Sequence, residues 1–215
     1  MKRKSIVLAM TGASGAIYGL RLGAEILRSG AHLAMLVSDA GVQVLREETG
    51  LDLGGGCDDV FHALAAHLGP GAGQLEYFAG DDFLAPVASG SSAPDAMVVC
   101  PCTMGTLARI ACGNSATLLE RCADVMVKER RPLVLVPRET PLSEIHLENM
   151  LKLTRLGVRM VPAMPDLRPQ FDDEESLGIR FFRAYLAGLS QVYLNGWSRI
   201  CGPRGAEGGG GSSYP

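Results

Sequence analysis

Short, uniformly apolar runs alternate along this chain with longer segments in which apolar residues recur every three or four positions. An unbroken apolar run predicts a strand that is covered on both faces, as in a parallel sheet, whereas the longer spacing predicts an amphipathic helix. The predicted strands are residues 5–10, 32–37, 96–100, 133–136 and 158–161. The predicted helices are residues 17–27, 40–48, 59–67, 103–112, 118–128, 143–156 and 172–189.

This alternation predicts an α/β fold, because helices that connect parallel strands must pack against the faces of the sheet. We expect a single three-layer flavodoxin/Rossmann-like domain with a parallel sheet flanked by helices. We assign residues 1–190 to this domain and residues 191–215 to a C-terminal extension that ends in a flexible Gly/Ser tail. Residues 50–80 are interrupted by glycines and give no clear pattern beyond one short helix.

Composition and charge exclude several classes of partner. The net charge is −3, whereas a protein that binds a nucleic-acid duplex usually has a basic face. Aromatic residues make up 6% of the chain, too few for a surface on which the bases of single-stranded nucleic acid stack. No apolar run is long enough to span a membrane, and Thr11 and Gly12 end the first run too early for a signal peptide. We therefore expect a cytoplasmic protein that binds neither nucleic acid nor a membrane.

The six cysteines include no Cys-x-x-Cys pair, and a chain of this size and apolar content does not need a disulfide framework. Reduced thiols are therefore expected. Cys100 and Cys102 flank Pro101 without a second pair nearby, which favours buried small hydrophobic residues over a metal site.

Small polar loops follow several of the predicted strands, where open α/β sheets bind their ligands. These loops contain Gly12–Ala16, Ser38, Thr103–Thr106 and the pair Arg138 and Glu139. Glycines allow close approach of a phosphate, and helix N-termini offer unpaired N–H groups, so the set predicts a phosphate-bearing ligand. The first loop matches neither Gly-x-Gly-x-x-Gly nor a Walker sequence, and taken alone it is equally consistent with a tight strand-to-helix turn.

Cationic side chains beside the polar loops that could bind a phosphate are Lys128 and Arg138, and Glu139 beside Arg138 could relay a proton. A serine hydrolase is disfavoured, because neither Ser14 nor Ser91 stands in a Gly-x-Ser-x-Gly sequence.

Five motifs together resemble the flavin prenyltransferase (UbiX-like) family. They are Met10–Ala16, Ala88–Ser92, Pro101–Leu107, Ala123–Leu133 and Pro137–Leu142, the last running on to His146–Leu151. The resemblance covers roughly residues 4 to 170. It implies a metal-independent enzyme, assembled as a homododecamer, that transfers a dimethylallyl group from dimethylallyl phosphate to reduced FMN. The product, prenylated FMN, would serve a partner decarboxylase.

The resemblance also implies roles for single residues. The residues that match FMN-binding positions are Gly12, Ala13, Ser14, Ser38, Thr103, Met104, Gly105, Thr106 and Arg138. The residues that match positions around the substrate phosphate and the reacting groups are Ser89, Arg121, Lys128 and Glu139, with Glu48 as a carboxylate for proton handling and Arg183 as a C-terminal phosphate ligand.

One segment departs from the family pattern. The family has a tyrosine that contacts the phosphate after the last strand, and Pro165–Pro169 is shorter and lacks it. This departure leaves open a paralogue that holds FMN without prenylating it. A related flavin-dependent cysteine decarboxylase is disfavoured, because the histidine and the Asn-rich motif of those proteins are not evident. Phosphate and diphosphate donors both remain open.

Overall fold

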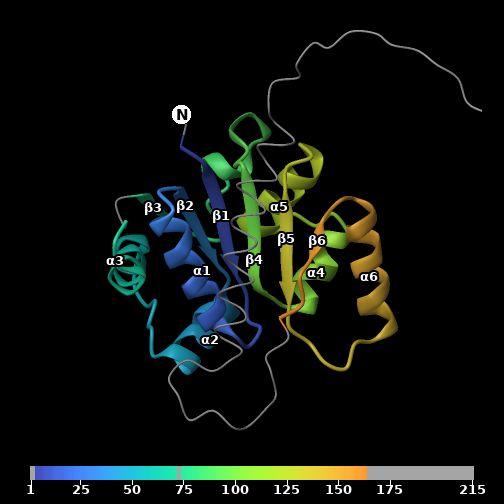
Figure 1. Cartoon of the computed structure of the whole chain (residues 1–215), viewed down its shortest axis with the longest axis horizontal. Helices are drawn as coiled ribbons and strands as arrows, with labels where there is room; N and C mark the ends of the chain where they lie inside the picture. Colours follow the sequence, from blue (N-terminus) through green and yellow to red (C-terminus); the bar gives the residue numbers. More distant parts are fainter. Residues whose placement is uncertain (1–2, 72–73, 164–215) are drawn as a thin grey trace, which may run out of the picture. The chain divides into compact units, whose positions relative to one another are not determined.

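The computed structural model describes residues 3–71 and 74–163, and the statements below concern these residues (Figure 1). The predicted helix at 172–189, the predicted domain boundary at residue 190, and Arg183 lie outside the described residues. The division of the chain into residues 1–190 and 191–215 therefore stays a prediction.

Six parallel strands form a single sheet in the order β3-β2-β1-β4-β5-β6. Their bounds are β1 Ser5–Met10, β2 His32–Val37, β3 Leu75–Phe78, β4 Ala96–Cys102, β5 Leu133–Pro137 and β6 Arg159–Met160. Because β1 and β4 are neighbours, the strand order reverses between them. This is the doubly wound order of Rossmann type, so the predicted fold class is confirmed.

Helices cover the sheet on both faces (Figure 1). Their bounds are α1 Ala16–Arg28, α2 Asp39–Thr49, α3 Cys57–Leu68, α4 Met104–Ala111, α5 Leu118–Lys128 and α6 Glu144–Arg155. Helix α1 contacts α2 and α3, whereas α4 contacts α5 and α6. Right-handed crossovers from parallel strands place these two groups on opposite faces of the sheet. None of the described helices is both long enough and apolar enough to cross a membrane.

Strand β3 is the element that the sequence did not predict. It has four residues, Leu75–Phe78, and only Leu75 is buried. A strand at the edge of a sheet has one neighbour, here β2, and it needs no long apolar run. Its pattern therefore does not stand out from the glycine-rich segment before it.

Two further boundaries differ from the prediction. Strand β4 continues through Pro101 to Cys102, so Pro101 belongs to the strand and not to the start of the next helix. The last predicted strand, residues 158–161, is reduced to Arg159–Met160. Cys100 and Cys102 are fully buried, as expected, and burial raises the pKa of the Cys102 thiol to about 12. The described residues contain no group of three or more side chains that could hold a metal ion.

Gly12 allows the end of β1 to lie against the start of α2. A Cβ atom added at Gly12 would lie 2.5 Å from the Cβ atom of Ala40. We expect Gly12→Ala to lower the free energy of unfolding by about 1–3 kcal/mol, the usual result of overpacking, in a denaturant titration. Gly80→Ala is the matched control, because a Cβ atom there meets nothing within 4 Å. Equal stability of the two variants would contradict this view of Gly12.

Candidate functional site

The loops after β1 and β4 meet at the carboxyl edge of the sheet, where the strand order reverses. Buried Thr11 joins them: its N–H and its hydroxyl both donate to the Pro101 carbonyl, at 3.1 and 2.9 Å. The same hydroxyl oxygen accepts a hydrogen bond of 2.8 Å from the Thr103 N–H. The first and third predicted ligand loops are therefore held side by side.

The start of α2 lies next to these two loops. The Ser38 N–H donates to the Met10 carbonyl at 3.0 Å, which fixes Ser38 at the end of β1. Its side chain caps α2 by accepting a hydrogen bond of 3.1 Å from the Gly41 N–H. The predicted residues Gly12 and Ser38, from two different strands, thus belong to one surface.

Glu48, from the last turn of α2, binds the N-terminus of α1. Its carboxylate accepts hydrogen bonds from the Ser14 hydroxyl (2.5 Å), from the Gly15 N–H (2.9 and 3.1 Å to the two oxygens) and from the Ala16 N–H (2.8 Å). Gly15 is the N-cap residue and has a φ of 103°, a left-handed conformation that favours glycine. A carboxylate at this end of a helix also interacts favourably with the helix dipole.

The surroundings of Glu48 favour its ionised form. Partial burial alone would raise the pKa of Glu48. The hydrogen bonds from Ser14, Gly15 and Ala16, together with the positive charge of Arg138, outweigh burial and hold the pKa below its ordinary value. Because the folded-state pKa is lowered, the stabilisation is present above the unfolded-state pKa and is lost as the pH falls through the folded-state value.

This shift predicts a pH dependence of stability. Between about pH 6 and about pH 3 we expect the wild type to lose more free energy of unfolding than Glu48→Gln, because the glutamine does not titrate. Denaturant titrations of both proteins across this range measure the difference. Parallel stability curves would contradict the ionised Glu48 described above.

Arg138 and Glu139 follow β5 at the same edge of the sheet. A Cβ atom built at Gly15 would lie 3.4 Å from Cδ of Arg138, which places the arginine beside the first loop. Arg138 is half-buried, whereas Glu139 is exposed and accepts a hydrogen bond of 3.0 Å from the Thr140 N–H. The two residues thus differ in environment although they are adjacent.

The turn at Thr103–Thr106 begins α4. The Thr103 side chain is the N-cap and accepts a hydrogen bond of 3.1 Å from the Thr106 N–H. The side chains of Met104 and Thr106 are buried, whereas Gly105 between them is exposed. The N–H groups of Met104 and Gly105 are in the first helical turn and have no intrahelical acceptor. This turn therefore offers backbone donors, the chemistry that binds a phosphate.

Three other predicted residues lie together, but elsewhere. The Arg121 Nε donates to the Ala88 carbonyl at 3.1 Å, next to Ser89. A Cβ atom at Gly90 would lie 2.9 Å from Nζ of Lys128, which also pairs with Glu129. Ser89, Arg121 and Lys128 thus form what we call the cationic cluster, between α5 and the turn before β4.

The cationic cluster is separated from the other predicted residues. Lys128 ends α5 shortly before β5 begins at Leu133, and Gly90 lies shortly before β4 begins at Ala96. Both therefore lie toward the amino edge of the sheet, whereas Gly12, Ser38, Glu48, Thr103 and Arg138 lie at the carboxyl edge. Figure 1 shows α2 at one end of the sheet, and the turns that precede β4 and β5 at the other. One chain does not bring the two groups together.

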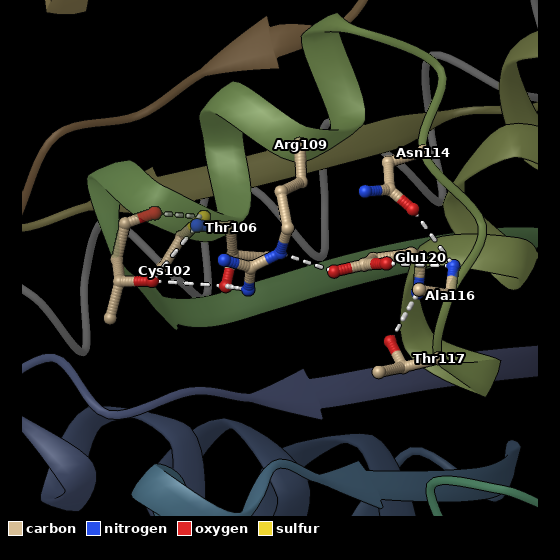
Figure 2. Close-up of polar contacts among 8 residues, drawn as sticks. Cys102, Thr106, Arg109, Asn114, Ala116, Thr117 and Glu120 are labelled. Carbon is tan, nitrogen blue, oxygen red and sulfur yellow. Dashed lines mark hydrogen bonds and ion pairs between the residues drawn. The ribbon is translucent and has the colours of Figure 1, made fainter.

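The sequence did not single out Thr11, Arg109 or Glu120, which hydrogen bonds join to the Thr103–Thr106 turn. Figure 2 shows the part of this network that links Thr106, Arg109 and Glu120. A signal was present for Glu120. It lies three residues before Ala123 and six before Met126, on the buried face of α5. A charged residue on an apolar helical face needs a partner.

The doubly wound parallel sheet, with small polar loops at its carboxyl edge where the strand order reverses, is that of a Rossmann-type protein. A family model described as Flavoprotein matches residues 1–177. The flavin prenyltransferase UbiX of Pseudomonas aeruginosa is 50% identical over 195 residues, covering 89% of this chain and 93% of that protein. The UbiX protein of Halalkalibacterium halodurans is 49% identical over 158 residues, covering 74% of this chain and 75% of that protein. The chain therefore belongs to the UbiX flavin prenyltransferases.

Solved structures agree with this assignment. The crystal structure of AnUbiX (PadA1) in complex with FMN and dimethylallyl pyrophosphate matches with a TM-score of 0.72 and 39% identity. That match covers 86% of this chain and 92% of the other. A dodecameric FMN-dependent UbiX-like decarboxylase from Escherichia coli O157:H7 matches with a TM-score of 0.71 and 36% identity, covering 86% of this chain and 94% of the other.

Proposed function

We propose that this protein is a flavin prenyltransferase that transfers a dimethylallyl group from dimethylallyl phosphate to reduced FMN. The observation that carries the proposal is the pair of half-sites: phosphate-binding loops at the carboxyl edge of the sheet, and the cationic cluster toward the amino edge. Relatives that cover most of the chain, together with the FMN and dimethylallyl pyrophosphate bound by AnUbiX, support FMN and a phosphorylated dimethylallyl donor as the substrates.

FMN would bind at the carboxyl edge. Because Glu48 already binds the N–H groups of Gly15 and Ala16, the flavin phosphate would bind the N-terminus of α4 or α2 instead. Ser38 and the Thr103–Thr106 turn would then contact the phosphate, and Arg138 would add a positive charge. Glycine at position 12 lets the end of β1 lie against Ala40 in the first turn of α2, which keeps the Ser38 loop beside the first loop.

The substrate phosphate would bind the cationic cluster of a second copy of the chain. A site built from both edges requires at least two copies, with the carboxyl edge of one against the amino edge of the next. The dodecameric UbiX-like protein from Escherichia coli supports an assembly of this kind, and we propose a homododecamer.

The reaction breaks the bond between the allylic carbon and the phosphate oxygen, and phosphate leaves with the electron pair. Lys128, Arg121 and the Ser89 hydroxyl would stabilise the negative charge that develops on this phosphate. FMN, when bound in its reduced form, supplies the nucleophile. Glu48 and Glu139 would accept or donate protons as the flavin ring gains a substituent.

The product would be prenylated FMN, passed to a decarboxylase that depends on it. No metal is needed for this chemistry, because the cationic side chains meet the leaving group. We propose a cytoplasmic location, in keeping with the five free cysteines among the described residues. The contribution of Arg183 and the effect of the shortened Pro165–Pro169 segment stay predictions, since both lie outside the described residues.

Release of phosphate tests the proposal. Purified protein is mixed without oxygen with dimethylallyl phosphate and either reduced or oxidised FMN, and free phosphate is measured. We expect phosphate to be released with reduced FMN only. The proposal would be overturned if dimethylallyl phosphate stayed intact although the protein was shown to bind FMN and a known prenyltransferase was active in the same assay. That result would favour the FMN-holding paralogue.

A further inference from the structure

Three polar or charged residues are buried in the described part of the chain: Thr11, Thr106 and Glu120, each at most 3% exposed. All three belong to one hydrogen-bonded network, in which Thr11 accepts from the Thr103 N–H and the Thr103 hydroxyl donates to Thr106. Figure 2 shows the rest of it, from Thr106 through Arg109 on α4 to Glu120 on α5. A buried polar group that is not hydrogen-bonded is costly, and a network of this kind restricts its members to one arrangement.

Glu120 is the far end of this network. One carboxylate oxygen accepts a hydrogen bond from Nε of Arg109, and the other accepts one of 2.9 Å from the Ala116 N–H. Arg109 belongs to α4, whereas Glu120 belongs to α5. The buried carboxylate therefore fixes the orientation of a guanidinium group on the neighbouring helix.

Arg109 in turn contacts the first turn of its own helix, α4. Its Nη2 donates to the Thr106 hydroxyl oxygen at 3.1 Å. The Thr103 hydroxyl also donates to that oxygen, at 2.9 Å, and the Thr103 N–H donates to Thr11. A Cβ atom at Gly105 would lie 3.5 Å from Nη1 of Arg109, so the guanidinium lies beside the first turn of α4.

We propose that Glu120 is a positioning residue for FMN, acting through Arg109 on the Thr103–Thr106 turn. The inference rests on the proposed function, because that turn is its FMN-binding element. Glu120 does not touch the flavin. It holds Arg109, Arg109 holds Thr106, and the Met104 and Gly105 N–H groups are thereby fixed before the ligand arrives. Such preorganisation raises affinity by reducing the ordering that binding requires.

This inference is tested without turnover by measuring the Kd of the full chain for oxidised FMN. Quenching of flavin fluorescence reports the bound fraction. The variants are Glu120→Gln, Arg109→Met and the double variant. We expect each single substitution to raise the Kd for FMN by about tenfold, as loss of a hydrogen bond to a charged group would. In turnover the KM for FMN should rise in parallel, while the KM for dimethylallyl phosphate stays unchanged.

The double variant separates positioning from stability. Arg109→Met leaves the buried Glu120 charge without its cation and should lower the unfolding midpoint. Adding Glu120→Gln removes that charge, so we expect the midpoint to recover while the Kd for FMN stays as high as in Arg109→Met. A Kd that recovers together with the midpoint would show a merely structural role and would overturn the inference.

Asp95→Asn is the matched control. Like Glu120, Asp95 contacts both a cation and a backbone N–H: its carboxylate pairs with Nζ of Lys4 at 3.6 Å and accepts a hydrogen bond of 3.0 Å from the Ser5 N–H. Unlike Glu120, it lies at the amino edge of the sheet. We expect its Kd for FMN to equal that of the wild type. A wild type that binds FMN without prenyl transfer would contradict the proposed function alone, whereas wild-type affinity in Glu120→Gln and Arg109→Met would contradict this inference alone.

Discussion

Replacing Lys128 with alanine is expected to lower kcat/KM for dimethylallyl phosphate by about 10²- to 10³-fold, the usual effect of removing one preorganised group that stabilises developing charge. Lys128 lies beside Gly90, the residue after Ser89, and has no place in the FMN half-site. The Kd for FMN should therefore stay unchanged. Steady-state kinetics and flavin fluorescence measure the two quantities separately.

Arg130→Gly is the matched control for Lys128→Ala. It also removes one positive charge from the end of α5, and glycine fits the backbone there because Arg130 has a φ of 52°. We expect this variant to keep nearly wild-type kcat/KM. Similar losses in the two variants would show that net charge matters and that the position of Lys128 does not.

Mixing two inactive variants is expected to restore activity. Arg138→Ala damages the carboxyl-edge half-site, and Lys128→Ala damages the cationic cluster. If each active site combines one edge from each of two copies, random assembly leaves about a quarter of the sites with both halves intact. We expect co-expressed or exchanged subunits to recover prenyl transfer toward that level, whereas either variant alone stays inactive.

The control mixture combines Lys128→Ala with Arg121→Ala. Both substitutions damage the cationic cluster, so every site in the mixture has a damaged half, and we expect no recovery. Failure of the Arg138→Ala and Lys128→Ala mixture, in subunits shown to have exchanged, would mean that the two half-sites do not meet between copies.

The sequence predicted the sheet, and the position of the small polar loops at its carboxyl edge, for a physical reason. Central parallel strands need long apolar runs, and their loops need small residues, so both leave a strong pattern. The edge strand β3 leaves no such pattern. Glu48 was predicted from the resemblance alone, because its hydrogen bonds to Ser14, Gly15 and Ala16 join segments more than 30 residues apart.

Two aspects of the site depend on three-dimensional arrangement and were not predictable. Of the residues matched to the substrate phosphate, Ser89, Arg121 and Lys128 lie toward the amino edge of the sheet, whereas Glu139 lies at the carboxyl edge with the residues matched to FMN. The Arg109–Glu120 pair joins two helices through a turn, and only the charged residue on the buried face of α5 pointed to it.

The flavin itself gives the most direct test of prenyl transfer. Protein is incubated without oxygen with reduced FMN and dimethylallyl phosphate, and the extracted flavin is analysed by mass spectrometry. We expect a flavin heavier than FMN by one five-carbon unit, absent when Lys128→Ala replaces the wild type. Recovery of FMN alone, from wild-type protein that binds FMN, would contradict this expectation.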